Sequence, residues 1–172
     1  MKKKSHWMIT NYALCGRLSP FRRFLIKLGC VMPDVLLYTF KRGHYYNATK
    51  GKVLREIDKL IFSNKPTALA CYKFGYQLHY VEDYFTYPHH FPYWQNRKRH
   101  AEYELSLQKE IPSFLSPYVF APVSEQGRPS SFIERYHALY LMRAGDVITD
   151  LSFMIPLVEY LVKLFCEDVF FD

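Results

Sequence analysis

Residues 65–88 read KPTALACYKFGYQLHYVEDYFTYP. Apolar residues recur there every three or four positions, which is typical of an α-helix, and they lie on nearly every side of it, which favours a central place in a bundle. We predict a buried helix over about 66–86, ended by Pro88. Within it, His79 and Asp83 are four residues apart and therefore share one face.

The same helical spacing recurs along the rest of the chain, and strict alternation over the length of a strand is hard to find. The sequence therefore predicts an all-α fold, a multi-helix bundle forming one domain over residues 1–172. The further helices are expected at about 5–16, 19–29, 48–62, 92–109, 130–144 and 147–169, with a linker over 31–47 and a loop over 112–130.

Local signals set the expected helix boundaries. Pro20 at a first helical position and Gly29 at a helix end bracket one helix, and Asn47 is the expected cap of the next. Pro112 is expected to stop the helix before it, and Pro156 to kink the last helix. On the helix over 48–62, the apolar residues expected to face inward are Val53, Ile57, Leu60 and Ile61.

The composition excludes a disordered chain, because 49% of the residues are hydrophobic and 18% are aromatic. The net charge of +7 suits nucleic acid, an anionic membrane surface or a phosphorylated substrate. The basic residues stand in short groups beside apolar ones, which favours peripheral contact with an anionic membrane over a DNA-reading helix. A solvated basic face with no partner is the simplest alternative.

No targeting or membrane-spanning segment is recognisable. Residues 1–20 lack a clean apolar run and a cleavage site, and residues 153–166 are too short and too charged to span a bilayer. The four cysteines, which have no C-x-x-C spacing, are expected to be reduced residues of the core. A cytoplasmic protein is therefore expected.

Two pairs of possible metal ligands repeat one spacing: His79 with Asp83, and His100 with Glu104. Each pair would project from one helix face and could chelate an ion. An ionised Asp83 in an apolar helix costs several kcal/mol, roughly, unless a cation neutralises it. Imidazole and carboxylate are ligands that zinc accepts. A single pair of this kind is more often a salt bridge or a core hydrogen bond.

Further candidates stand nearby in the sequence: His89 between the two pairs, Asp34 and His44 beside chain-bending residues, and His6 near the amino terminus. So many ligands imply more than one metal ion. His90 and His137 have no partner at metal spacing and are expected to be surface or hydrogen-bonded residues.

The ordered set of these residues resembles the zinc-dependent phospholipase C family, whose all-helical fold is also used by zinc-dependent single-strand nucleases. The segments that carry the resemblance are PDVLLYTFKRGH, LHYVEDYFTYPHH and HAEYE. The family pattern H-x3-D-x5-H followed by H-x3-E is matched by His79, Asp83, His89, His100 and Glu104. The resemblance covers about residues 5–105.

The resemblance implies two zinc ions and a third beside them. It assigns one ion to Asp34, His44, His79 and Asp83. It assigns the second to His89, His100 and Glu104. Asp83 would bridge to the third ion together with His6; in secreted members the amino group of a terminal tryptophan also binds this ion, whereas here Met1 precedes His6 by five residues.

The activity expected from the resemblance is hydrolysis of a phosphoester in a phospholipid or small phosphodiester, with a zinc-activated water as nucleophile. Asp34 is alternatively the general base. Two other functions stay open: a nuclease or phosphomonoesterase using the same metal site, or a non-catalytic helical domain, stabilised by zinc, that binds a membrane or a partner. Aromatic residues around the ligands are core residues or line a cleft that accepts lipid or bases.

Overall fold

The computed structural model describes residues 1–36, 45–63, 66–90, 97–115 and 127–167. These residues form α-helices and two short 3-10 helices (η), and no strand occurs among them, which confirms the predicted all-α fold. The elements are α1 (Lys3–Ala13), α2 (Pro20–Val31), η1 (Met32–Asp34), α4 (Tyr46–Ile61), α5 (Ala68–Tyr84), η2 (Tyr87–His89), α6 (Arg97–Leu115), α7 (Pro129–Leu141) and α8 (Val147–Cys166).

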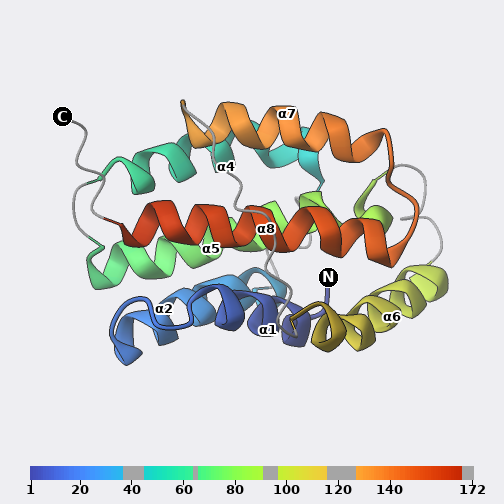
Figure 1. Ribbon diagram of the computed structural model, residues 1–172, viewed down its shortest axis with the longest axis horizontal. Coiled ribbons are helices and arrows are strands. Elements are labelled where there is room, and N and C mark those ends of the chain that lie inside the picture. Colours follow the sequence, from blue (N-terminus) through green and yellow to red (C-terminus); the bar gives the residue numbers. More distant parts are fainter. Residues whose placement is uncertain (37–44, 64–65, 91–96, 116–126, 168–172) are drawn as a thin grey trace.

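The helices lie in three tiers, with α5 and α8 in the middle (Figure 1). In that view α4 and α7 cover one side of this pair, and α1, α2 and α6 cover the other. The side chain of Thr67 caps α5 by accepting the amide of Ala70 at 3.2 Å. From His79 to Tyr84 every residue of α5 is buried, so the predicted central helix is confirmed.

The backbones of α2 and α5 touch where two glycines face the neighbouring helix. A Cβ on Gly75 would lie 1.9 Å from the carbonyl oxygen of Ile26, and one on Gly29 would lie 2.1 Å from that of Tyr72. Gly29 was expected to end a helix, but α2 continues to Val31 and then into η1, so that prediction was wrong. Gly29 instead permits the close approach, which brings the end of α2 next to the middle of α5.

Several predicted boundaries also differ from the structure. The first helix covers Lys3–Ala13 instead of 5–16, and Tyr45, not Asn47, is the cap residue of α4. Helix α6 runs through Pro112 to Leu115, so the loop expected from 112 does not begin there. The burial of Leu107 and Ile111 on the core side of α6 accounts for the continuation, because it outweighs one missing backbone hydrogen bond.

The four predicted inward residues of α4 are all buried, which confirms that face of the helix. The cysteine prediction was wrong in one case, since Cys15 follows the end of α1 and is exposed. Pro156 lies inside α8. In the described part of the chain, no helix is long and apolar enough to cross a bilayer.

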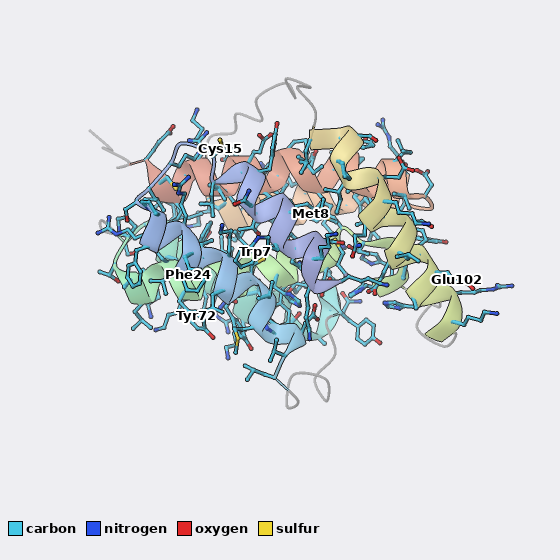
Figure 2. All side chains as sticks on the ribbon, turned by 90° about the horizontal axis from the view of Figure 1, so that it is seen from below. Trp7, Met8, Cys15, Phe24, Tyr72 and Glu102 are labelled. Atoms are coloured by element: carbon cyan, nitrogen blue, oxygen red, sulfur yellow. The ribbon has the colours of Figure 1, made fainter. Side chains whose placement is uncertain are left out.

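The lower side of the bundle in Figure 1 is formed by α1, α2 and α6, which Figure 2 shows face on. Trp7 lies there at the junction of α1 and α2, with 36% of its side chain exposed and the amino group of Lys27 4.5 Å from its ring. Trp7 is therefore partly exposed at the surface, while His6, the residue before it, points inward and is fully buried.

Candidate metal centre

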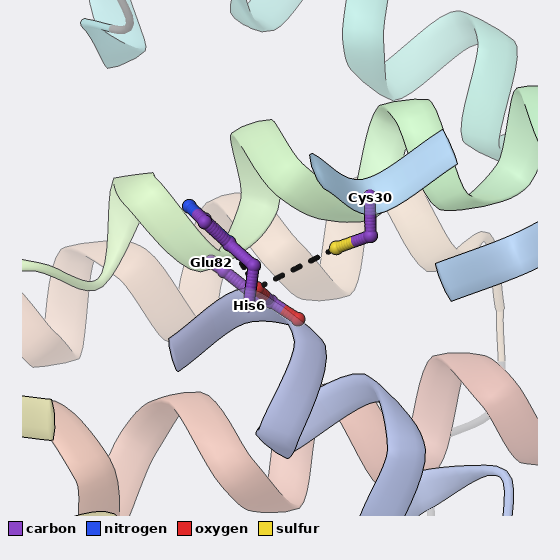
Figure 3. A group of neighbouring side chains, drawn as sticks. All are labelled: His6, Cys30 and Glu82. Atoms are coloured by element: carbon purple, nitrogen blue, oxygen red, sulfur yellow. Dashed lines mark hydrogen bonds and ion pairs between the residues drawn. The ribbon is translucent and has the colours of Figure 1, made fainter. Parts of the chain in front are cut away.

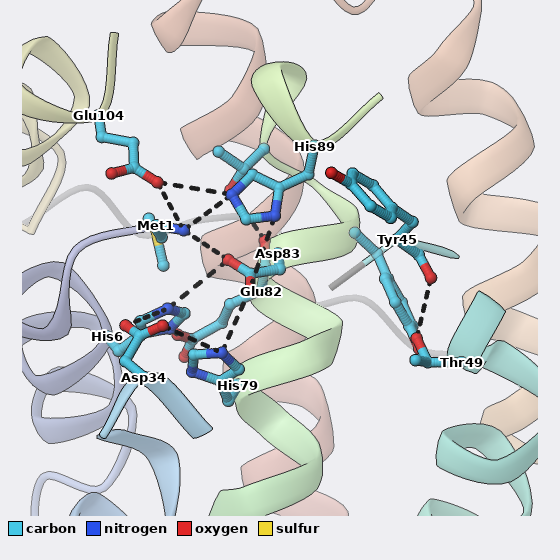
Figure 4. A network of polar contacts seen from close by, with 12 residues as sticks. Met1, His6, Asp34, Tyr45, Thr49, His79, Glu82, Asp83, His89 and Glu104 are labelled. Atoms are coloured by element: carbon cyan, nitrogen blue, oxygen red, sulfur yellow. Dashed lines mark hydrogen bonds and ion pairs between the residues drawn. The ribbon is translucent and has the colours of Figure 1, made fainter. Parts of the chain in front are cut away.

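Seven of the eight predicted ligands lie in the described part of the chain and form one cluster; Figure 4 labels all of them except His100. The eighth, His44, lies outside the described residues. The seven come from five elements: His6 from α1, Asp34 from η1, His79 and Asp83 from α5, His89 from η2, and His100 and Glu104 from α6.

The first group is formed by His6, Asp34 and His79, whose ligand atoms all lie within 4.8 Å of one another. Nε2 of His6 is 3.9 Å from one Asp34 oxygen, and Nε2 of His79 is 3.7 Å from the other. Asp83 adds a carboxylate, with oxygens 3.6 Å from Nε2 of His6 and 3.3 Å from Nε2 of His79. Two imidazoles and two carboxylates thus surround one point.

The Nδ1 atoms of His6 and His79 contact polar groups on the side away from the carboxylates of Asp34 and Asp83. Nδ1 of His79 lies 2.9 Å from the carbonyl oxygen of Cys30, which can only accept a hydrogen bond, so Nδ1 carries the proton. Nδ1 of His6 contacts the Glu82 carboxyl group. The Nε2 lone pair of His79 is therefore directed toward the carboxylates of Asp34 and Asp83, and Nε2 of His6 faces the same two carboxylates.

Lone pairs and carboxylate oxygens repel each other unless a cation lies between them. Nε2 of His6 is fully buried and has no hydrogen-bond partner among the described residues. Burial lowers the pKa of His6 well below its usual range, and the neighbouring His79 lowers it further. A neutral imidazole with an unpaired buried lone pair is the donor that a divalent metal requires, so the group fits a zinc ion.

The second group is formed by His89, His100 and Glu104. Oε1 of Glu104 lies 2.9 Å from Nε2 of His100 and 3.5 Å from Nε2 of His89. Burial lowers the pKa of His89 to about 4, so this ring is also neutral at pH 7. Although burial opposes it, hydrogen bonds from His100, His89 and the amino terminus hold the pKa of Glu104 well below its usual range. This group offers two imidazoles and one carboxylate.

Asp83 connects the two groups, because the oxygen nearest His79 also lies 3.6 Å from Nδ1 of His89. The amino group of Met1 lies beside it, 2.7 Å from Asp83 and 3.0 Å from both His89 and Glu104. Burial lowers the pKa of this amino group, but the charges of Asp83, Glu104 and Asp34 outweigh burial and raise it to about 10. The sequence predicted that a cation neutralises Asp83, but it did not identify the Met1 amino group as one.

A second layer of buried polar groups supports His6 (Figure 3). Glu82, fully buried, accepts hydrogen bonds from the hydroxyl of Thr10 at 3.1 Å and the thiol of Cys30 at 3.7 Å, besides its contact with His6. Burial raises the pKa of Glu82 well above its usual range, and these hydrogen bonds oppose that effect. The sequence signal for Glu82 was an acid beside Asp83 in an apolar helix.

A buried carboxylate on α8 ties the second group to the core. Asp150, fully buried, accepts the amide of Tyr87 at 2.9 Å, the hydroxyl of Tyr103 at 2.9 Å and the hydroxyl of Tyr140 at 2.7 Å. Tyr87 is two residues before His89, and Tyr103 is the residue before Glu104. Sequence reasoning missed Asp150, because none of its partners is near it in the chain.

The centre opens into a cavity of about 680 Å³. Its lining comprises Met1, Lys2, Lys3, Lys4, Asp34, Tyr45, His89, His100, Glu104 and Gln108. Residues from both groups therefore face one cavity, in which a substrate could reach them. Asp34 is the member of the first group that reaches the cavity wall.

The remaining two described histidines lie on the other side of η2. Nε2 of His90 contacts the carbonyl oxygen of Tyr84 at 2.7 Å, and His137 is buried with its ring stacked 3.7 Å from that of Tyr46. Burial lowers the pKa of His137 to about 3, so it is neutral. The prediction that His90 is a hydrogen-bonded residue is confirmed.

Comparison with known proteins gives one match. Residues 5–146 match the model of a family described as zinc dependent phospholipase C. No curated protein and no solved structure matches the chain.

Proposed function

Because the chain belongs to the zinc-dependent phospholipase C family, we propose that it hydrolyses a phosphodiester bond in a phospholipid or a smaller phosphodiester. Membership implies a hydrolase of the phospholipase C type that depends on zinc. The observation that carries the finer proposal is the convergence of imidazole lone pairs and carboxylates at the wall of one large cavity.

The proposal assigns zinc ions to the groups described above. We assign one ion to the point that His6, Asp34, His79 and Asp83 surround, with His44 as a further ligand. We assign a second ion to His89, His100 and Glu104. The unpartnered Nε2 of His6 and the retained proton on Nδ1 of His79 support this assignment.

Bound zinc would lower the pKa of a coordinated water toward neutrality and polarise the phosphate oxygens. The residues of the chain supply the geometry. Cys30 and Glu82 fix the orientation of the two imidazoles, so their lone pairs need no rearrangement when substrate arrives. Burial of these rings excludes water from all sides except the cavity.

Asp34 is the residue proposed to accept the proton of the attacking water. Its side chain is 16% exposed and lines the cavity, unlike those of His6 and His79 in the same group. A carboxylate in that position can take a proton from a water attacking the phosphorus atom. As the bond from the water oxygen to phosphorus forms, the bond from phosphorus to the glycerol oxygen breaks. The products are a phosphorylated headgroup and a diacylglycerol, whose oxygen takes up a proton.

The test is turnover by protein loaded with zinc. We expect hydrolysis of a soluble short-chain phospholipid, and Asp34→Asn should lower kcat by about a hundredfold or more. Arg22→Gln, an exposed change on α2 outside the cavity lining, is the matched control. Purified protein that binds no zinc, or an Asp34→Asn variant with full activity, would refute the proposal.

A second candidate function is hydrolysis of single-stranded nucleic acid at the same groups. The specific observation that favours it is the presence of three lysines and Tyr45 in the cavity lining, since these can contact phosphates and stack on a base. Parallel assays on phospholipid, oligonucleotide and nitrophenyl phosphate separate the candidates. Peripheral contact with an anionic membrane, supported by the net charge of +7, accompanies the first candidate only.

A further inference from the structure

Two cavities meet at the metal centre. The cavity described above shares Tyr45 and His89 with a second cavity of about 590 Å³. The second cavity is lined by the start of α4, by η2 and by the end of α7 with the turn that follows. Since both cavities contain His89, a molecule bound at the second group can extend into either of them.

The first cavity carries positive charge. Lys2, Lys3 and Lys4 line it, and helix α1 begins at Lys3 with no acidic residue in its first turn. The amino end of a helix adds a partial positive charge at the same place. The carboxylates among its described lining residues are Asp34 and Glu104, both assigned to the metal centre.

The second cavity has a different character. Its lining combines the aromatic rings of Tyr46 and Tyr87 with the apolar side chains of Leu141 and Ala144. Leu141 is 50% exposed and Met142, the next residue, is 82% exposed, so the apolar wall continues to the surface. This wall suits hydrocarbon, because burial of apolar area against it is favourable.

The headgroups of phospholipids differ in charge. A quaternary ammonium or an ammonium group is recognised by carboxylates or by several aromatic rings around it. The described lining of the first cavity offers one aromatic ring, that of Tyr45, and three lysines, which repel a cation. A headgroup without positive charge avoids that repulsion, and the net negative charge of its lipid is attracted.

We infer that the preferred substrate is a phospholipid of net negative charge, of the phosphatidylglycerol type, with its headgroup in the lysine-lined cavity and its acyl chains along the wall formed by Leu141 and Ala144. This inference rests on the proposed function and specifies its substrate class. The juxtaposition of a basic and an apolar cavity on either side of His89 carries it. The apolar cavity favours a lipid over an oligonucleotide, which has no hydrocarbon chain to place there.

The test compares dihexanoyl phosphatidylglycerol with dihexanoyl phosphatidylcholine, both monomeric in solution, as substrates of the full chain loaded with zinc. We expect kcat/KM to be at least about fivefold higher for the anionic lipid, and the ratio to fall as salt is added. The double variant Lys3→Glu/Lys4→Glu should abolish or invert the ratio. The matched control is Lys59→Glu/Lys73→Glu, which makes the same charge change at exposed lysines outside both cavities and should leave the ratio unchanged.

The acyl end has its own measurement. Leu141→Glu should lower turnover of the lipid more than turnover of the deacylated glycerophosphodiester, whereas Leu139→Glu, exposed on α7 but outside the cavity lining, should not. Melting curves establish that each variant is folded.

Two results would overturn the inference alone: equal or faster turnover of phosphatidylcholine, or a lipid preference that survives Lys3→Glu/Lys4→Glu. Preferential cleavage of a single-stranded oligonucleotide would also overturn it. Absence of turnover of either lipid by zinc-loaded protein would instead refute the proposed phospholipid hydrolysis, and the inference with it.

Discussion

Substitution of Asp150 tests how the second metal group is held in place. Its carboxylate is fully buried and accepts three hydrogen bonds, from Tyr87, Tyr103 and Tyr140. Asp150→Ala removes the acceptor for all three donors. Asp150→Asn keeps one oxygen, which can accept from Tyr87 and Tyr103, and presents an amide to Tyr140, whose hydroxyl oxygen can accept it.

The magnitude follows from those donors. A buried donor without a partner costs about 1–3 kcal/mol. The bond to Tyr140 is buried, whereas those to Tyr87 and Tyr103 are partly buried, so water can replace part of what these two lose. We expect the alanine variant to be less stable than the asparagine variant by about 3 kcal/mol.

The pH dependence gives a second magnitude. Burial raises the pKa of Asp150 from 3.8 to about 6, with hydrogen bonds from Tyr87, Tyr140 and Tyr103 opposing and Asp146 adding to it. Because the folded state binds this proton more tightly than the unfolded state, the proton stabilises the fold at low pH, and that stabilisation is lost as pH rises from about 4 to about 6. The stability of the native protein relative to Asp150→Asn should fall over that range by about 3 kcal/mol.

The assay is denaturant unfolding of the native protein and both variants between pH 4 and pH 8, together with zinc content after dialysis against graded chelator. Since Tyr87 and Tyr103 stand beside ligands of the second group, Asp150→Ala should lose zinc from that group first. The reasoning fails if the alanine and asparagine variants are equally stable, or if the difference between the native protein and Asp150→Asn does not change with pH.

Three further predictions concern the core and the metal. Gly75→Ala should destabilise the fold by about 3 kcal/mol, because a Cβ 1.9 Å from the Ile26 carbonyl oxygen must push α2 away by about 1.5 Å. Gly145→Ala is the control, since a Cβ there has no neighbouring atom within 4 Å. Equal unfolding midpoints for the two variants would contradict the prediction. Glu82→Gln should weaken zinc binding about tenfold to a hundredfold, because it replaces the carboxyl group that contacts Nδ1 of His6 with an amide. Chelator competition measures this, and unchanged affinity would contradict the supporting role of Glu82. Removal of zinc by chelator should lower Tm, because metal stabilises only the folded chain; an identical melting curve would count against bound metal.

Much of the fold could be predicted because helical spacing and caps are local signals. The buried middle helix and the inward face of α4 follow from periodicity. The errors have a common cause, which is contact with distant parts of the chain. Gly29 was expected to end a helix, but its role is the close contact with the backbone of Tyr72. Pro112 was expected to stop a helix, but α6 continues through it with Ile111 buried in the core.

The candidate site divides in the same way. The order and spacing of the candidate ligands follow from the sequence alone, because the helical repeat places His79 with Asp83 and His100 with Glu104. The tertiary structure alone decided which nitrogen of each ring faces the carboxylates, since that depends on Cys30 and Glu82 lying behind the rings. It also decided that the Met1 amino group lies among the acids and that Asp150 holds η2 and α6. These contacts join residues up to 103 positions apart for Met1 and up to 63 positions apart for Asp150. Local periodicity carries no information about such separations, whereas the packing of α2 on α5 and of α8 on α6 sets them directly.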